Sequence, residues 1–477
     1  MRKDIMLDES IPDLLRELMS LLLAHRAAFR QQRTFRRCLA LLFGEIFAFA
    51  RHTVTQALLA LGLTDADWTA WYRLFGCERY DEEKLSSCLF RQTLTEVEED
   101  EPYVVGIDAT QLERSSQRMP GTAWLPAPKT APFRRGIHRA QRFEHIAWLP
   151  PIEEGYTRAI PLRFIPAFPA KAVPAGCAPR KEWEAGLELV RWVRSKLDEA
   201  GRSNELLVTL GDGKNDTVQF WRELPEDVMA VVRTASNRRL REVPGPQVGR
   251  GRRRKYGKVV PSPSEWVKER KGWRKEEVEV RGRRLEMRYR LEGPYLREGV
   301  PGRPLWLLVV GGQTWLAGKK ERRRKQREPA YYLVSGVKCG EGWEVPLTDV
   351  QILSLMWQRW EMEVAHREMK SGFGVGEKQC WGKRSTVAAV QWSVWAYSVL
   401  VLAGYRAWGW FEGPKPPGRW WKGSKRWSLN TLWRGYRSAL WATPEFRAIW
   451  TGTDDNWPKK ESWLAGLYNA AASAARA

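Results

Sequence analysis

The chain has 477 residues, of which 43% are hydrophobic, and its formal net charge is +23. This length predicts two or three domains with packed cores, and the basic excess favours a polyanionic partner, because Lys and Arg neutralise phosphates. The six cysteines form no CxxC pair, which argues against a zinc ribbon or a disulfide scaffold and fits a reducing cytoplasm.

Residues 9–95 are expected to be helical, because apolar residues recur there at helical spacing. One short helix is expected to end before Gly62, and the next to run from an N-cap at Thr64 to a stop at Gly76. Two short helices across a tight turn are compatible with a helix-turn-helix. Residues 1–100, however, hold 13 Lys or Arg against 16 Asp or Glu, and this negative balance favours a plain helical bundle.

From Tyr103 onward the pattern becomes that of a mixed α/β sheet. Strands are expected in the apolar runs YVVGIDATQL, RFEHIAWLP, AIPLRFIPAF, ELLVTLGD and VMAVVRTA, with a Pro/Gly-rich loop at 119–137. A long helix ended by Gly201 and a short helix over NDTVQFWREL lie between the later strands. The first strands follow one another as hairpins, and the later strands alternate with helices. This order indicates a sheet with both antiparallel and parallel strands.

Residues 238–330 hold 28 Lys or Arg against 11 Asp or Glu, and the segments between the basic runs alternate as strands do. This pattern predicts a basic, β-rich insertion. A strong helix follows, with Thr348 as its N-cap and Gly372 at its end. The uncharged stretch 385–405 is long enough to cross a bilayer, but its polar residues and mid-run tryptophans favour a buried core helix.

Two aspartates follow buried strands, as expected for a site at a sheet edge. Asp108 is expected at the end of its strand, and Asp212 directly after another. Either alone is a weak signal, because an Asp after a strand often only begins a turn. Asp216 is a rival for the second position, but it is expected inside the following helix.

The third candidate carboxylate is Glu363, on the helix that Thr348 begins. Arg359, His366 and Lys370 share its helical face, so cations surround the carboxylate. Such a face can hold a metal ion and phosphates together. A solvated charged helix with ordinary ion pairs is the alternative explanation.

These features together resemble the DDE transposases of bacterial insertion sequences that carry a YREK signature. The segment MWQRWEMEVAHREMK has Arg359, Glu363 and Lys370 at the family spacing, with Met356 in place of the tyrosine. The segments GIDATQLERSSQRMPGTAWLP and LVTLGDGKNDTVQFW resemble the first and second Asp segments, and RTASNRRL and GRRRKYG resemble the arginine-rich stretches that follow the second. The resemblance runs from about residue 45 to residue 385.

The resemblance implies a ribonuclease-H-like mixed sheet with a β-rich insertion, flanked by helical N- and C-terminal regions. The expected parts are 1–100, helical and a candidate for DNA binding; 101–237, the first part of the catalytic core; 238–345, the insertion; 346–384, the glutamate helix; and 385–477, helical and Trp-rich. It also implies that Asp108, Asp212 and Glu363 hold two Mg²⁺ ions, with Mn²⁺ as an alternative.

DNA contacts are expected from residues beside the carboxylates and in the insertion. These are Arg359, Lys370, His366, Arg252, Arg253, Arg254, Lys255 and Trp315. Of the insertion's tryptophans, Trp306 is expected in a core, whereas Trp315 follows a Gly–Gly turn and is the candidate platform for a flipped base. The alternative is that Trp266, Trp273, Trp306 and Trp315 are all structural.

The implied function is cutting of transposon ends and joining of them to target DNA. The implied partners are those DNAs and a second copy of the chain assembled on DNA, with no membrane, in the cytoplasm at the nucleoid. A nuclease of the same fold, a domesticated transposase that binds DNA without transposition, and a basic RNA-binding protein are alternatives. The RNA-binding protein would explain the charge but not the ordered Asp, Asp and Glu.

Overall fold

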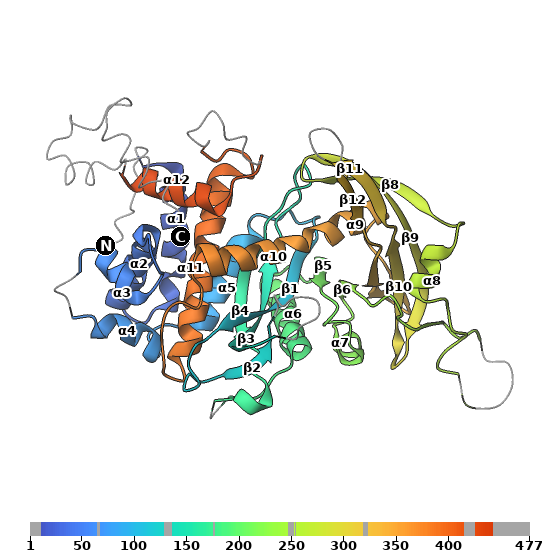
Figure 1. Cartoon of the computed structure of the whole chain (residues 1–477), viewed down its shortest axis with the longest axis horizontal. Helices are drawn as coiled ribbons and strands as arrows, with labels where there is room; N and C mark the ends of the chain where they lie inside the picture. Colours follow the sequence, from blue (N-terminus) through green and yellow to red (C-terminus); the bar gives the residue numbers. More distant parts are fainter. Residues whose placement is uncertain are drawn as a thin grey trace.

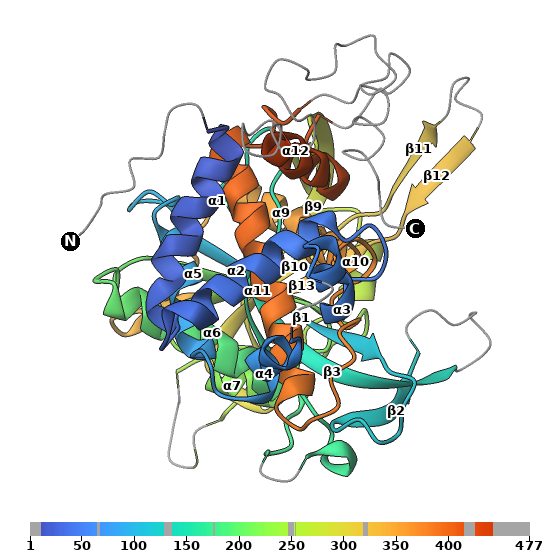
Figure 2. The ribbon, with the colours of Figure 1, turned by 90° about the vertical axis from the view of Figure 1, so that its left-hand side faces the viewer.

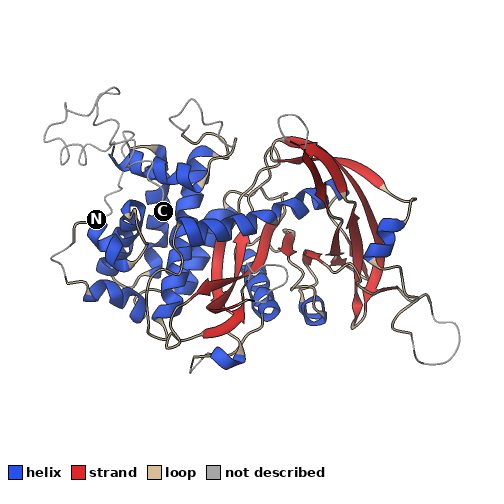
Figure 3. Cartoon of the chain, in the orientation of Figure 1, coloured by secondary structure: helices blue, strands red, loops and turns tan. Residues whose placement is uncertain are grey.

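The computed structural model describes residues 11–63, 67–127, 136–174, 177–246, 252, 254–317, 323–414 and 425–441. Helices gather at one end of the long axis and strands at the other (Figures 1 and 3). The expected class, a mixed α/β protein with one large sheet, is therefore confirmed.

The helical segments are α1 Asp13–Ala24, η1 His25–Ala28, α2 Gln32–Phe47, α3 Val54–Ala60, α4 Thr69–Gly76, α5 Glu82–Leu94, η2 Ala170–Ala172, α6 Glu182–Glu199, α7 Val218–Glu223, α8 Pro263–Lys268, α9 Asp349–Gln358, α10 Trp360–Arg367, η3 Glu368–Gly372, α11 Ser385–Trp408 and α12 Leu429–Trp441. The strands are β1 Tyr103–Glu113, β2 Thr122–Pro126, β3 Ile137–Trp148, β4 Ile160–Pro166, β5 Leu207–Gly211, β6 Val228–Arg233, β7 Leu240–Glu242, β8 Arg274–Val280, β9 Arg283–Arg297, β10 Val300–Val310, β11 Gln313–Ala317, β12 Arg323–Arg327, β13 Ala330–Ser335, β14 Val337–Cys339 and β15 Gly342–Glu344.

One eleven-stranded sheet forms the centre of the protein. Its order is β2-β3-β1-β5-β6-β13-β10-β9-β7, with β4 also paired to β3 and β8 to β9. Strand β1 is antiparallel to β3 and parallel to β5, which is parallel to β6. Beyond β6, the strands of the basic segment continue the same sheet, because β13 pairs antiparallel with β6.

Helices from both ends of the chain pack together on one side of this sheet. The long helix α11 lies between β4 and α1, and α4, α5 and α12 also contact it (Figure 2). It is long and apolar enough to cross a membrane, yet 89% of its most apolar window is buried inside the protein. The stretch 385–405 is therefore part of a core helix, as its composition predicts.

The helix that carries Glu363 begins at the predicted N-cap, but it is not one continuous α-helix. The Thr348 hydroxyl accepts a hydrogen bond from the Gln351 amide, so Thr348 is the N-cap. The helix is interrupted at Arg359 and finishes as the π-helical segment η3, which ends at Gly372. The expected loop 119–137 also contains a strand, β2, because β3 extends past the end of β4 and leaves residues 137–141 of its outer edge free to pair.

The N-cap expected at Thr64 lies outside the described residues, and α4 begins at Thr69. In the described N-terminal region, α3 packs on α2 and α4 packs on α11 and α2. All six cysteines lie within the described residues and are free, as their spacing predicts.

A buried ionic cluster joins α2 to the segment that follows the glutamate helix. The Lys378 ammonium lies 2.7 Å from one Glu45 oxygen, and the His52 ring nitrogen lies 2.6 Å from the other. Burial alone would raise the pKa of Glu45, but the Lys378 charge and the His52 hydrogen bond lower it below its ordinary value of 4.5. The N-terminal helices are thus tied electrostatically to the end of the catalytic candidate helix.

Replacing Lys378 by Met should lower the free energy of unfolding by about 3–5 kcal/mol at pH 7, because the Glu45 carboxylate loses its buried counter-charge. Since the folded pKa of Glu45 is lowered, its carboxylate contributes stability above pH 4.5, and this contribution is lost as the pH falls through the folded value. Urea unfolding at several pH values measures both effects. The double variant Glu45→Gln/Lys378→Met is the control and should recover part of the loss. A Lys378→Met protein as stable as the wild type would contradict the assignment.

Candidate active site

Asp108 lies in the middle of β1, whereas the sequence predicts it at the strand's end. The strand runs five residues further, to Glu113, and these residues pair with β3 alone because the parallel neighbour β5 has already ended. The apolar run stops at Ile107 because only the first half of β1 has a strand on both sides. Asp108 therefore stands where the sheet opens beside β1.

Asp212 follows β5 directly, as the sequence predicts. The β1–β5 register pairs Gly106 with Leu210, and continuing it by two residues sets Asp108 opposite Asp212. Neighbouring strands lie about 4.8 Å apart, so the two aspartates occupy the same edge. Burial, and then repulsion from Asp212, raise the pKa of Asp108 to about 7. The two carboxylates form a negatively charged pair that favours a proton or a cation.

The helix α10 covers the face of β1 that carries Asp108. Side chains alternate along a strand, so Gly106 and Asp108 point to the same face. A Cβ atom on Gly106 would lie 2.5 Å from the Met362 sulfur, and Met362 is fully buried. The glycine thus lets α10 approach the sheet closely, with Glu363 next to the contact.

Glu363 is bound to the arginine one turn before it. Arg359 donates a hydrogen bond of 2.8 Å to Glu363 Oε1, and the same guanidinium interacts electrostatically with Asp108. Among the described residues, no group of three or more His, Cys, Asp or Glu side chains is arranged to hold a metal ion. Two carboxylates therefore occupy the edge, while the third is paired with an arginine that also interacts with Asp108.

Two histidines adjoin Asp108 on this face. His366 Nδ1 lies 3.8 Å from the Asp108 carboxylate, and His145 donates from Nδ1 to the Asp108 backbone carbonyl at 2.7 Å. Burial lowers the pKa of both rings, that of His145 to about 3, and the Lys370 charge lowers both further. Both imidazoles are therefore neutral at pH 7, and the Lys370 charge lies close enough to influence both of them.

His145, Glu144 and Lys214 also adjoin the two aspartates, and none of them is among the residues predicted from the sequence. Glu144 is fully buried on the opposite face of β3, and burial followed by repulsion from Asp108 raises its pKa. Lys214 forms an ion pair of 3.2 Å with Glu182 and interacts with Asp212 and Asp108. Glu144 and His145 could have been found from the sequence, because they are two adjacent ionisable residues inside the apolar run RFEHIAW.

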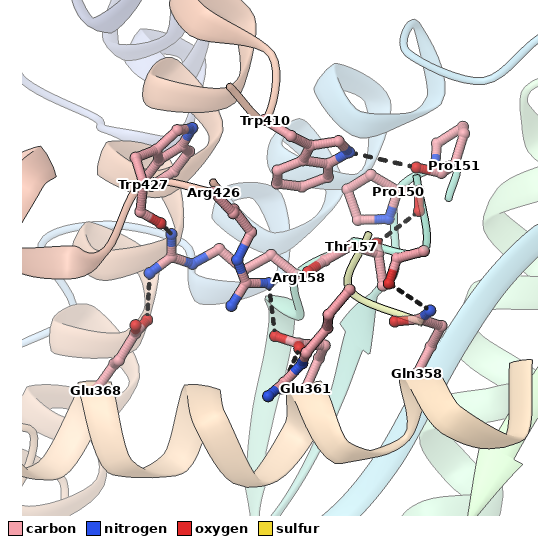
Figure 4. A network of polar contacts seen from close by, with 12 residues as sticks. Pro150, Pro151, Thr157, Arg158, Gln358, Glu361, Glu368, Trp410, Arg426 and Trp427 are labelled. Atoms are coloured by element: carbon pink, nitrogen blue, oxygen red, sulfur yellow. Dashed lines mark hydrogen bonds and ion pairs between the residues drawn. The ribbon is translucent and has the colours of Figure 1, made fainter. Parts of the chain in front are cut away.

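A buried ion-pair network holds the other face of α10 and η3, as Figure 4 shows. We call it the α10 network, and its members are Glu361, Glu368, Arg158, Arg281 and Arg426. Arg426 and Arg281 bind the two oxygens of Glu361 at 2.7 and 3.0 Å, and Arg158 binds Glu368 at 2.5 Å. Arg158 also lies 4.4 Å over the Trp427 ring. These contacts fix the rotation of the helix and thereby direct its other face toward Asp108.

Asp216, the rival for Asp212, precedes α7 instead of lying within it, because Thr217 is the N-cap. Its carboxylate is fully buried, with ion pairs to Arg238 at 2.5 Å and Arg297 at 3.1 Å. Trp221 and Thr234 also donate hydrogen bonds to it. Asp216 is thus a structural anchor between the core strands and β9, with no free oxygen directed at the edge.

The other expected DNA-binding residues lie apart from the carboxylates. Arg252, Arg254 and Lys255 are exposed on the loop between β7 and α8, and five strands separate β7 from β1 in the sheet. Arg253 lies outside the described residues. Trp315 is on β11, paired with Lys325 of β12, and its side chain is not described. The basic loop is therefore a separate surface.

Replacing Gly106 by Val should push α10 away from the sheet and lower the free energy of unfolding by about 1–3 kcal/mol, the usual cost of overpacking. Thermal or urea unfolding measures the loss. The double variant Gly106→Val/Met362→Ala restores the space between the helix and the sheet. Its loss of unfolding free energy should be smaller than the sum of the losses of the two single variants. Additive losses would show that the two side chains do not meet.

In metal-free buffer, the difference in unfolding free energy between Asp108→Asn and the wild type should depend on pH. Because the folded pKa of Asp108 is raised from 3.8 to about 7, the acid's stabilising contribution is full below pH 3.8 and is lost as the pH rises to about 7. In urea unfolding, the stability of the Asn variant relative to the wild type should therefore rise between pH 3.8 and about pH 7, and Mg²⁺ should reduce this difference in stability. Glu113→Gln, on the exposed end of the same strand, is the control. A gap that stays constant with pH would contradict the raised pKa.

Comparison with known proteins identifies the family. A family model described as DDE superfamily endonuclease matches residues 25–294, a range that contains both aspartates and ends before Glu363. No curated protein matches the chain. Among solved structures, the chain is similar to the piggyBac transposase in a synaptic complex with hairpin DNA, with 12% identity over 96% of this chain and 76% of that one. The TM-score is 0.33, too low for this likeness to carry an argument. Since the family model covers more than half of the 477 residues, the chain belongs to the DDE superfamily of endonucleases.

Proposed function

We propose that this protein is a DNA transposase that cuts transposon ends and joins them to target DNA. The observation that carries the proposal is the pair Asp108 and Asp212 on neighbouring strands, with the Glu363 helix packed against the first of them. In a member of the DDE endonucleases, three carboxylates in this chain order are the expected catalytic set. Glu363 also has Arg359 and Lys370 at the spacing of the YREK signature.

The arrangement of strands supports a ribonuclease-H-like core. The order β4-β3-β1-β5-β6, with β1 antiparallel to β3 and parallel to β5, corresponds to that fold. The β-rich segment lies between β6 and α9, where transposases of the resembling type carry their insertion. We accordingly propose the parts 101–237 and 346–384 as the core and 238–345 as its insertion.

Asp108 and Asp212 suit a divalent cation as they stand, whereas Glu363 is paired with Arg359. Burial together with Asp212 raises the pKa of Asp108, which is the electrostatic state that a hard cation relieves. Glu363, with its side chain 40% exposed, would complete the set by leaving Arg359. Two Mg²⁺ ions held by Asp108, Asp212 and Glu363 would supply activation of the attacking oxygen and stabilisation of the leaving one.

The cations of α10 and η3 would hold DNA phosphates at this edge. Arg359 carries a planar guanidinium beside both Asp108 and Glu363, so a phosphate that binds it would release Glu363. Lys370 lies near His145 and His366 and offers a second cation. The two neutral rings line the same face and keep solvent from Asp108, since both are largely buried.

The proposed partners are transposon-end and target DNA, with two copies of the chain assembled on DNA at the nucleoid. Trp315 remains the candidate platform for a flipped base. Two other insertion tryptophans already stack with arginines, because Arg288 lies 4.2 Å over Trp273 and Arg290 lies 4.2 Å over Trp266. Trp306 packs against the core, as expected.

Asp108→Asn should abolish metal-dependent nicking of end DNA and leave duplex binding within about threefold, because it removes one charge from the site and changes no contact on the basic surfaces. Nicking is measured with labelled duplex in Mg²⁺ and in EDTA, and binding by fluorescence anisotropy. The control is Glu113→Gln, an exposed carboxylate on the same strand, which should cut normally.

Precleaved DNA with a free 3′-hydroxyl separates the proposed transposase from a nuclease of the same fold. Joining to a target plasmid supports transposition, whereas nicking without joining supports the nuclease. Binding without metal-dependent nicking by the wild type would instead indicate a domesticated protein and refute the enzyme assignment.

A further inference from the structure

A cavity between the start of α2 and α4 concentrates positive charge far from the carboxylates. Its volume is about 190 Å³, and α2, α4 and the turn after α4 all contribute to it. Its polar lining consists of Gln31, Arg33, Thr34, Arg37, Arg73 and Arg79. Four guanidinium groups from three segments of the chain thus converge on one small space.

These arginines are not neutralised by neighbouring carboxylates. Within the described residues, none of the four makes an ion pair, and Arg33 donates a hydrogen bond of 2.7 Å to the amide oxygen of Gln31. Asp67 is fully exposed; its pKa is lowered first by hydrogen bonds from Thr69 and then by the charges of Arg73 and Arg37. Among the described residues, one solvated carboxylate against four arginines leaves an excess of positive charge at the cavity.

The N-terminal end of α2 adds to the positive potential of the cavity. The helix has 16 residues, and its N-cap, Gln31, makes no side-chain capping hydrogen bond. The positive end of the helix dipole therefore points toward the space that Arg33 and Thr34 line, and such an end favours anions. The convergence is notable because residues 1–100 as a whole carry more acidic than basic residues.

We propose that this arginine cavity binds a backbone phosphate of duplex DNA. Guanidinium groups bind oxyanions with paired hydrogen bonds, and DNA, the partner in the proposed function, presents its oxyanions as phosphates. The lining contains no aromatic ring on which a base could stack, so the site reads the backbone and not the sequence.

A backbone phosphate fits the cavity better than a free phosphate does. Arg33 and Arg73 are exposed and Arg37 and Arg79 half-buried, which suits a polymer laid across the surface. The inference rests on the proposed function for its choice of DNA. It extends that function by placing a contact at the helical end of the molecule, opposite the basic strands (Figure 1).

The test compares duplex binding by the full chain and by single variants in a salt series. Arg37→Ala and Arg73→Ala should each weaken binding about tenfold and lower the slope of log K against log salt by about 1. Arg36→Ala is the matched control, because Arg36 is an exposed arginine on the same helix that does not line the cavity. It should change affinity by no more than about twofold. Arg37→Lys, which keeps the charge, should fall between, and unfolding curves verify that each variant is folded.

Four outcomes are decisive. Equal effects of Arg36→Ala, Arg37→Ala and Arg73→Ala would overturn the proposal. Protection of the wild type by inorganic phosphate in thermal unfolding, lost in Arg37→Ala while duplex affinity is unchanged, would assign the cavity to a free phosphate and also overturn it. If the wild type binds duplex through these arginines but does not nick DNA, the proposed enzyme is refuted and the proposal for the cavity is upheld. If the wild type nicks DNA but its binding does not depend on these arginines, the proposal for the cavity is refuted and the proposed enzyme is upheld.

Discussion

The orientation of α10 depends on buried ion pairs that lie on the side away from the candidate active site. Glu361 and Glu368 have almost no solvent contact, and each would be strongly destabilising without its arginine partners. Their partners come from the β3–β4 connection, the β8–β9 turn and the segment before α12. Because three distant parts of the chain meet on this helix, its rotation is fixed, and Arg359, Glu363 and His366 are directed toward the sheet.

The edge that faces them is held in a charged state that favours a cation. Asp108 and Asp212 repel one another across neighbouring strands, and Glu144 adds a buried carboxyl group behind them. Arg359 and Lys214 offset part of this repulsion. A buried carboxylate beside a second carboxylate costs stability in the free protein, and a bound cation would offset this cost.

The basic segment is built onto this core and is not separated from it. Strand β13 pairs directly with β6, and Arg297 of β9 reaches back to the buried Asp216 beside Asp212. The β-rich end is therefore joined both to the core sheet and to the segment that follows the second aspartate. Positive charge is found at both ends of the long axis, on the loop of Arg252 and in the arginine cavity, with the carboxylates between them.

The sequence by itself determined the elements whose signals are local. Apolar runs marked β1 and β5, the position of Asp212 followed from the second run, and Thr348 marked the start of the helix that carries Glu363. Helical spacing placed Arg359 next to Glu363, because residues four apart lie on one face. The mixed α/β class followed from the order of these runs.

Only the tertiary structure decided what depends on strand pairing and on distant charges. Asp108 lies inside β1 because β3 extends beyond β5, and no local pattern reveals the length of a partner strand. His145 meets Asp108 through antiparallel register, and Arg158 meets Glu368 across 210 residues of sequence. Periodicity shows which side chains share a face, but burial, pKa and ion pairing depend on what packs against that face, and this is set by contacts between residues far apart in the chain.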